Sequence, residues 1–168
     1  MKIPRIAYTA YAFAVIVIVV DQLTKAWVLD LDGARYEGLL TTVIPSVFRL
    51  SMVHNDGVSF GLFGGGAARW GLSVFSLIVA GLLGRWATKV DRRLLITAIG
   101  LVMGGALGNV IDRIRFGYVV DFLDFSAIGF PYVFNVADSA ITIGVVLLLA
   151  DTFLSERAAK VGVAAEKS

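Results

Sequence analysis

The sequence contains no cysteine, one histidine (His54) and three prolines among its 168 residues. Without cysteine the chain can form neither a disulfide framework nor a thiolate metal site. A lone histidine outside any His/Glu cluster also argues against a zinc site, and we expect no cofactor. Charged residues make up only 17% of the chain, against about 25% in an average soluble protein. The net charge of +2 is too small to indicate a nucleic-acid-binding protein.

Hydrophobic residues are abundant, at 58% of the chain with a mean hydropathy of +0.82. This composition is typical of a multi-spanning membrane protein, and the length suits a single membrane domain without a separate soluble module. Long apolar stretches predict four transmembrane helices. Their expected ranges are about 6–29, 70–87, 94–111 and 132–153. The first stretch resembles a signal peptide, but Asp21 and Lys25 stand where a cleavage site should lie, so we expect it to remain uncleaved.

Two polar connections separate these helices, at 30–69 and 112–131, and a charged tail follows at 154–168. Within the first connection, apolar and polar residues alternate over 41–53, which predicts one or two short strands. An amphipathic stretch at 58–63 predicts a short helix on the membrane surface. The expected fold is therefore an all-α membrane protein with a small extracytoplasmic β-sheet and a surface helix in the first outer loop.

The distribution of lysine and arginine predicts the orientation in the membrane. With the N-terminus inside, the inner segments hold nine of these residues and the outer segments hold six, with a dense inner cluster at 85–93. We therefore expect a multi-pass protein of the cytoplasmic membrane with both termini cytoplasmic. The two connections, and the acids Asp121 and Asp138, would then lie near the outer face.

Asp121 and Asp138 are the acids that the apolar surroundings make most unusual. Asp138 precedes an uncharged run over 141–150, and Asp121 lies between Val120 and Phe122. Ionisable residues in membrane segments are functional candidates because an isolated charge there is costly. Two adjacent carboxylates share a proton, so one can activate water while the other protonates a substrate. We therefore interpret Asp121 and Asp138 as one site, suited to peptide hydrolysis without a covalent intermediate.

Several alternatives remain open from the residues alone. Asp138 could be a helix N-cap, although the apolar residues from 132 onward suggest that the helix begins earlier. Asp121 could be a loop carboxylate with Asp124 as its twin. Paired carboxylates also serve ion coupling, so a non-enzymatic transporter or membrane scaffold is the alternative function, although four spans without an internal repeat make a weak transporter.

Other polar residues cluster at the same helix ends. Asn109, Asp112 and Arg113 have the i, i+3, i+4 spacing that places them on one helix face. Asp112 could simply pair with Arg113 or Arg115. Asn135 has i, i+3 spacing with Asp138 at the start of the fourth span. Asp21 and Lys25 have the i, i+4 spacing of a structural ion pair, whereas Asn55 by itself would be an ordinary turn residue.

Five sequence blocks together resemble the lipoprotein signal peptidase (signal peptidase II) family. They occur in order along nearly the whole chain. The blocks are DQLTK at 21–25, NDGVSFG at 55–61, GGALGNVIDR at 104–113, VVDF at 119–122 and FNVADSAI at 134–141.

The resemblance implies an aspartic endopeptidase of the bacterial cytoplasmic membrane. Such enzymes remove the signal peptide of prolipoproteins by cutting before a diacylglyceryl-modified cysteine. The matched positions imply that Asp121 and Asp138 are the catalytic dyad. The positions implied to bind substrate or to position the site are Asn55, Asn109, Arg113 and Asn135, and those implied to support it are Asp21, Lys25 and Asp112.

The resemblance also implies partners: prolipoproteins, membrane lipids and globomycin-type inhibitors. We expect the protein to be a monomer. One block departs from the family pattern. Residues 58 and 59 are Val58 and Ser59, where the family often has two alanines. The departure leaves the dyad assignment intact and concerns only the contacts of this loop with substrate.

Overall fold

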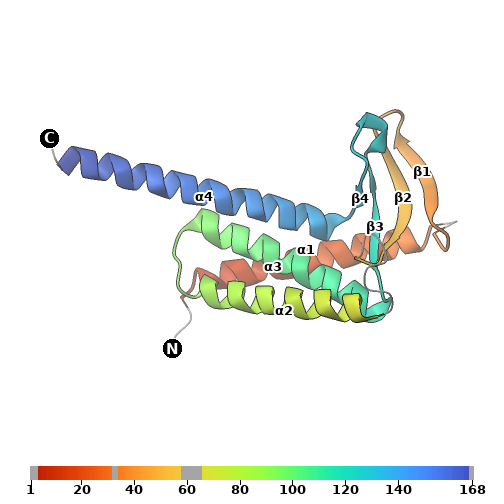
Figure 1. The fold of residues 1–168 in the computed structure, drawn as a ribbon, viewed down its shortest axis with the longest axis horizontal. Helices are drawn as coiled ribbons and strands as arrows, with labels where there is room; N and C mark the ends of the chain where they lie inside the picture. The colour runs from red at the N-terminus through yellow and green to blue at the C-terminus, as the bar shows by residue number, and fades with distance from the viewer. Residues whose placement is uncertain (1–3, 32–33, 58–65, 167–168) are drawn as a thin grey trace.

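Four long helices form most of the protein in a computed structural model that describes residues 4–31, 34–57 and 66–166 (Figure 1). They are α1 (Ala7–Leu29), α2 (Ala67–Ala87), α3 (Arg93–Arg115) and α4 (Val136–Glu166). Each is long and apolar enough to cross a membrane. The predicted four-helix membrane fold is confirmed.

Helix α3 lies at the centre of the bundle and packs against the other three helices. Most of its side chains are buried, whereas α1, α2 and α4 each carry many exposed large hydrophobic residues, such as Ile16, Phe75 and Val146. An exposed apolar face on a long helix is suited to contact with lipid. The bundle therefore has a protein-facing core helix and three helices with a lipid-facing side.

Glycines on α3 allow this close packing. A Cβ atom added at Gly104 would lie 2.6 Å from the Cβ of Val17 and 2.8 Å from the backbone oxygen of Ala14, both on α1. A Cβ at Gly105 would instead meet Ile141 of α4 at 2.7 Å. Adjacent glycines thus bring two different helices close to the α3 backbone.

A small antiparallel sheet covers one end of the bundle. Its strands are β1 (Gly38–Ile44), β2 (Phe48–Asn55), β3 (Val119–Asp124) and β4 (Val133–Phe134), in the order β1-β2-β3-β4. A short 3₁₀ helix, η1 (Ser126–Ile128), links β3 towards β4. The first two strands confirm the strand prediction at 41–53. The other two lie where the sequence suggested a plain connection and the start of a helix.

The sheet is anchored to the bundle through one apolar face. Leu50 and Met52 of β2 and Val120 and Phe122 of β3 form a buried cluster with Val28 at the end of α1. Successive side chains of a strand point to opposite faces, so Asp121 lies on the face of β3 opposite to Val120 and Phe122. This alternation separates the acid from the apolar anchor.

Two element boundaries differ from the sequence prediction. Helix α4 begins at Val136 rather than near 132, because Val133 and Phe134 pair with Asp124 and Leu123 of β3. Helix α3 continues to Arg115, beyond the expected end at 111. The surface helix expected at 58–63, together with Val58 and Ser59, lies outside the described residues. Figure 1 places both termini at the end of the bundle opposite the sheet.

The close approach at Gly104 yields a stability test. We expect Gly104→Ala to lower the thermal unfolding midpoint in detergent, because the added methyl group must displace the α1 backbone, at a cost of about 1–3 kcal/mol. Gly81→Ala on α2 is the matched control, since nothing lies within 4 Å of its added Cβ. The control should unfold at the same temperature or slightly higher. Equal midpoints for the two variants would contradict the packing role of Gly104.

Candidate active site

Asp121 is a buried acid in the middle of β3, with only 1% of its surface exposed. Its Oδ1 accepts a hydrogen bond from Nδ2 of Asn135 at 2.7 Å, and its Oδ2 accepts one from Nδ2 of Asn55 at 2.8 Å. Asn55 is two residues beyond Val53, which pairs with Asp121 in the sheet register. Pairing of β2 with β3 therefore places the Asn55 amide beside the acid, on a diagonal of the sheet.

Asp138 lies in the first turn of α4 and is half-buried. Its backbone N–H donates to Oδ1 of Asn135 at 2.9 Å, and its Oδ2 accepts from the backbone N–H of Asn135 at 3.3 Å. This reciprocal pair is a capping box with Asn135 as the N-cap. The sequence interpretation that the cap precedes Asp138 is confirmed, although the cap lies at Asn135 and not before 132, because β4 occupies the preceding residues. Asp138 therefore lies at the positive end of the α4 dipole.

Two asparagine amides connect the acids. Nδ2 of Asn135 contacts Asp121 and also donates to Oδ1 of Asn109 at 3.2 Å. Nδ2 of Asn109 in turn donates to Oδ1 of Asp138 at 2.8 Å. Both asparagines are buried. The structure therefore brings together Asp121, Asp138, Asn109 and Asn135, which come from three separate sequence blocks.

The surroundings raise the pKa of Asp121 from 3.8 to about 7. Burial is the main cause, because a carboxylate loses its hydration, and the negative charge of the neighbouring Asp138 acts in the same direction. Hydrogen bonds from Asn55 and Asn135 oppose the rise. Asp121 therefore carries a proton up to about neutral pH.

Asp124, three residues further along β3, is also buried, but its pKa is shifted in the opposite direction. Burial by itself would raise its pKa, but donors from Ser126 and Ser51 and the charge of Arg49 outweigh that effect and lower the pKa to about 2. Ser51 donates at 2.7 Å, and a guanidinium nitrogen of Arg49 lies 3.1 Å away. Asp124 is thus permanently ionised and ties β2 to η1, away from the two asparagines.

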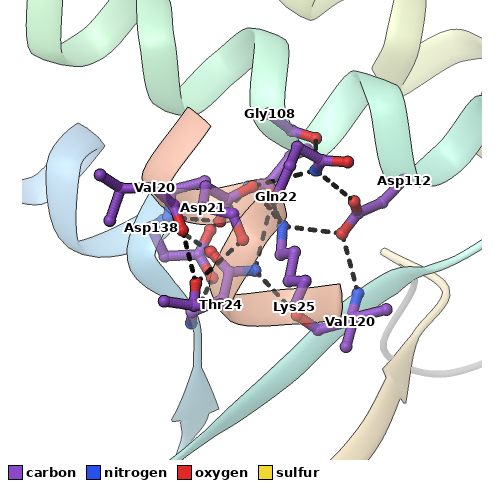
Figure 2. A network of polar contacts seen from close by, with 12 residues as sticks. Val20, Asp21, Gln22, Thr24, Lys25, Gly108, Asp112, Val120 and Asp138 are labelled. Atoms are coloured by element: carbon purple, nitrogen blue, oxygen red, sulfur yellow. Dashed lines mark hydrogen bonds and ion pairs between the residues drawn. The ribbon is translucent and has the colours of Figure 1, made fainter. Parts of the chain in front are cut away.

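A buried ion cluster lies close to Asp138 (Figure 2). Nζ of Lys25 lies 2.9 Å from Oδ2 of Asp21 and 2.7 Å from Oδ2 of Asp112. It also donates to Oδ1 of Asn109 at 3.2 Å. The predicted Asp21–Lys25 ion pair is present. The alternative that Asp112 simply pairs with Arg113 or Arg115 is wrong, because Asp112 pairs with Lys25 of α1.

The cluster also holds the elements that carry the two acids. Oδ1 of Asp21 accepts the backbone N–H of Ala137, next to Asp138, at 2.9 Å. Oδ2 of Asp112 accepts the backbone N–H of Val120, next to Asp121, at 3.1 Å. One ion cluster on α1 and α3 therefore fixes both the start of α4 and the start of β3.

Gln22 belongs to this network although sequence reasoning assigned it no role. Its side-chain Nε2 donates to Oδ1 of Asp112 at 2.8 Å, and its Oε1 accepts a hydrogen bond from Arg115 at 3.1 Å. The sequence signal that could have identified Gln22 is its polar side chain next to Asp21 in an otherwise apolar helix. Arg115 is accordingly a partner of Gln22 rather than of Asp112.

Arg113 approaches the site from the other side. Its guanidinium interacts electrostatically with Asp138, Asp112 and Asp121. Within the described residues its hydrogen bond is a long one, 3.5 Å to the backbone oxygen of Asn109, and its buried Nε has no partner. Arg113 is thus a cation near the acids, and within the described residues its Nε–H donor has no hydrogen-bond partner.

Two cavities are lined in part by residues of this site. One, of about 220 Å³, lies between α2, α3 and α4 and is lined in part by Asn109 and Arg113. The other, of about 350 Å³, lies beside α4 and β4, with Asp138 in its wall. Its lining is otherwise mainly aromatic and aliphatic, and comprises Phe130, Tyr132, Phe134, Ser139, Thr142 and Ile143. Apolar side chains or acyl chains would therefore fit beside Asp138 in one cavity and beside Asn109 and Arg113 in the other.

Comparison with known proteins connects this geometry to a family. The sequence profile of signal peptidase (SPase) II matches residues 13–154. A lipoprotein signal peptidase of Caulobacter vibrioides is 48% identical over 93% of each chain. A lipoprotein signal peptidase from Sphingopyxis alaskensis is 40% identical, and the match covers 84% of this chain and 83% of the relative.

Solved structures agree with this relationship. Two bacterial membrane enzyme structures determined by the in meso method each superpose with a TM-score of 0.76. The first is 30% identical, and the match covers 88% of this chain and 89% of the solved chain. The second is 31% identical, and the match covers 86% of this chain and 92% of the solved chain. With its four helices, its sheet and its profile match over 13–154, this chain belongs to the signal peptidase II family.

Proposed function

We propose that Asp121 and Asp138 form a catalytic aspartic dyad that removes the signal peptide of prolipoproteins before a diacylglyceryl-modified cysteine. The observation that carries the proposal is the pair of buried asparagines that joins the two carboxylates at one end of an apolar bundle. Family membership supports the prolipoprotein substrate. Proximity of two acids supports acid–base hydrolysis of a peptide bond.

The two acids have different roles in the proposed reaction. Asp121 is the protonated partner at neutral pH or below, because burial and Asp138 raise its pKa to about 7. Asp138 is the carboxylate, stabilised by the Asn109 donor and the start of α4. A dyad with one proton can act as acid and base at once.

Hydrolysis then proceeds in two steps. Asp138 takes a proton from water as the water oxygen attacks the scissile carbonyl carbon, while Asp121 gives its proton to the carbonyl oxygen. The resulting tetrahedral diol collapses when Asp138 returns its proton to the leaving nitrogen and Asp121 regains one from a hydroxyl group. The C–N bond breaks, and both acids return to their initial protonation states.

The remaining site residues position substrate and dyad. Arg113 has donors available for a substrate carbonyl near Asp138. Asn55 holds Asp121 from the sheet side. Asp21, Lys25 and Asp112 act as structural support, through the backbone groups next to each acid. The two flanking cavities would accommodate the apolar parts of a lipidated peptide, and a globomycin-type inhibitor would compete for them.

We also propose that both termini are cytoplasmic and that the dyad lies near the outer face. Arg85, Lys89 and Arg92 lie towards the end of the bundle that holds the termini, and the positive-inside tendency supports a cytoplasmic location for that end. The sheet and the dyad lie at the other end. Both acids come from one chain, so a monomer contains the complete proposed site.

The alternative of an ion-coupled transporter or a non-enzymatic scaffold is not favoured. The profile and the curated relatives are those of peptidases. Paired carboxylates alone would suit either activity. The alternative would gain support only from proton-driven flux in vesicles without any cleavage.

Replacing either dyad acid tests the catalytic proposal. We expect Asp121→Asn and Asp138→Asn each to lower cleavage of a diacylglyceryl-modified peptide by roughly 10³-fold or more, because each removes one half of the acid–base pair. The assay uses purified protein in detergent and compares the lipidated peptide with its unlipidated twin, which should not be cleaved. Asp124→Asn is the matched control and should retain most activity. Full activity in either dyad variant would remove that residue from the dyad.

The pH dependence of cleavage tests the proton on Asp121. Because the pKa of Asp121 is raised to about 7, the active form is present below that pH and is lost above it. We expect kcat/KM to fall about tenfold per pH unit above about pH 7. Asp124→Asn should leave this limb unmoved, because Asp124 is ionised throughout. A rate that stays constant from pH 7 to about pH 9 would contradict the assignment.

The ion cluster predicts a combined loss of stability and activity. Lys25→Met leaves two buried carboxylates without their cation, at a cost of about 3–5 kcal/mol. We expect a lower unfolding midpoint and weak cleavage, whereas Lys89→Met, an exposed lysine at the other end, should behave like wild type. Adding Asp112→Asn to Lys25→Met should cost less than the sum of the two single changes. Strict additivity would show that Lys25 and Asp112 do not act together.

A further inference from the structure

A separate cavity of about 600 Å³ lies at the end of the bundle that holds the termini. It is formed between the start of α1 and the start of α3. Its lining combines two guanidinium groups, two hydroxyl groups and two isoleucines. These residues are Arg5, Ile6, Thr9, Arg93, Ile96 and Thr97. None of them contributes to the proposed active site, which lies at the opposite end of α3.

The two arginines bring positive charge to the cavity. In the part of the chain that the structure describes, no carboxylate oxygen lies within 4.0 Å of Arg5 or Arg93. Their neighbour Arg92 differs, because it lies 2.8 Å from Asp151 and also contacts Ser155. Arg92 therefore holds α4 in place, whereas Arg5 and Arg93 remain available for an anion from outside the chain.

The surface beside this cavity is apolar. One turn along α1 from Thr9 comes Phe13, followed by Ile16, which is 57% exposed. One turn along α3 from Thr97 comes Leu101, which is half-buried. Residues spaced by three or four positions share a helix face, so a strip of hydrocarbon runs from the cavity along the bundle. A ligand with a charged head and long apolar chains would match both parts.

We propose that this cavity binds the headgroup of an anionic phospholipid, with Arg5 and Arg93 on the phosphate, Thr9 and Thr97 as hydroxyl donors, and the acyl chains along Phe13, Ile16 and Leu101. Basic pockets between transmembrane helices are suited to such headgroups. Ile6 and Ile96 in the wall, and the position at the end of four apolar helices, favour a lipid over a free phosphate ion. The proposal is independent of the catalytic dyad.

Lipid binding to the full-length protein in neutral detergent tests the proposal. Dissociation constants for dioleoyl phosphatidylglycerol and dioleoyl phosphatidylcholine are measured by native mass spectrometry, together with the unfolding midpoint in each lipid. Wild-type protein should bind phosphatidylglycerol more tightly. Arg5→Gln and Arg93→Gln should each weaken that binding about fivefold, and the double variant about 25-fold.

Arg85→Gln is the matched control, since Arg85 is an exposed arginine in the last turn of α2 and does not line the cavity. It should bind both lipids like wild type. Equal weakening by Arg85→Gln would indicate diffuse charge attraction and overturn the site, and so would equal binding of the two lipids by wild-type protein. A similar rise of the unfolding midpoint with inorganic phosphate would overturn the lipid assignment.

A second variant keeps the test independent of folding and of net charge. Thr9→Val with Thr97→Val retains both arginines and removes only the two hydroxyl groups. We expect it to weaken phosphatidylglycerol binding while leaving the lipid-free unfolding midpoint and the cleavage activity unchanged. Unaltered binding in both this variant and the double arginine variant would overturn the proposal.

Discussion

The buried ammonium group of Lys25 is the interaction on which the geometry of the site depends. It lies between Asp21 and Asp112, and each of these carboxylates accepts a backbone N–H next to one of the paired acids. Burying three charges costs several kcal/mol per ion before their mutual attraction is counted. Such a cluster is stable only when its remaining hydrogen-bonding positions are filled, and here the backbones of α4 and β3 fill them. The same contacts that satisfy the charges therefore set the distance between the two acids.

Three aspartates on β3 and α4 show how different surroundings give one residue type different roles. Asp124 is surrounded by donors and a guanidinium, which lower its pKa to about 2 and make it a structural anion. Asp121 also has little exposed surface, but burial and a negative neighbour raise its pKa to about 7. Asp138 lies in the first turn of α4, at the positive end of the helix dipole. The proposed acid and base thus differ because strand β3 and helix α4 present them to different surroundings.

The central position of α3 links membrane packing to this chemistry. Its glycines admit α1 on one side and α4 on the other, which lets Asp21 reach the first turn of α4. At the far end, the same approach of α1 to α3 forms the basic cavity proposed to bind a phospholipid headgroup. A lipid held there would bridge the two helices whose other ends support the dyad. Membrane contact and catalytic geometry would then share the α1–α3 interface.

The sequence by itself determined the four membrane helices, because long apolar stretches with few charges have little alternative in lipid, and it singled out Asp121 and Asp138, because charges among apolar residues are costly. Alternation over 41–53 likewise predicted strands. Only the tertiary structure decided the rest. Strand β3 and the late start of α4 depend on pairing with residues distant in the chain, so no local pattern revealed them. The partner of Asp112 was Lys25, 87 positions away in the numbering, rather than the adjacent Arg113. A local pattern records which residues favour a helix or a strand, whereas a buried charge is satisfied by whichever partner the packing of separate elements brings within reach.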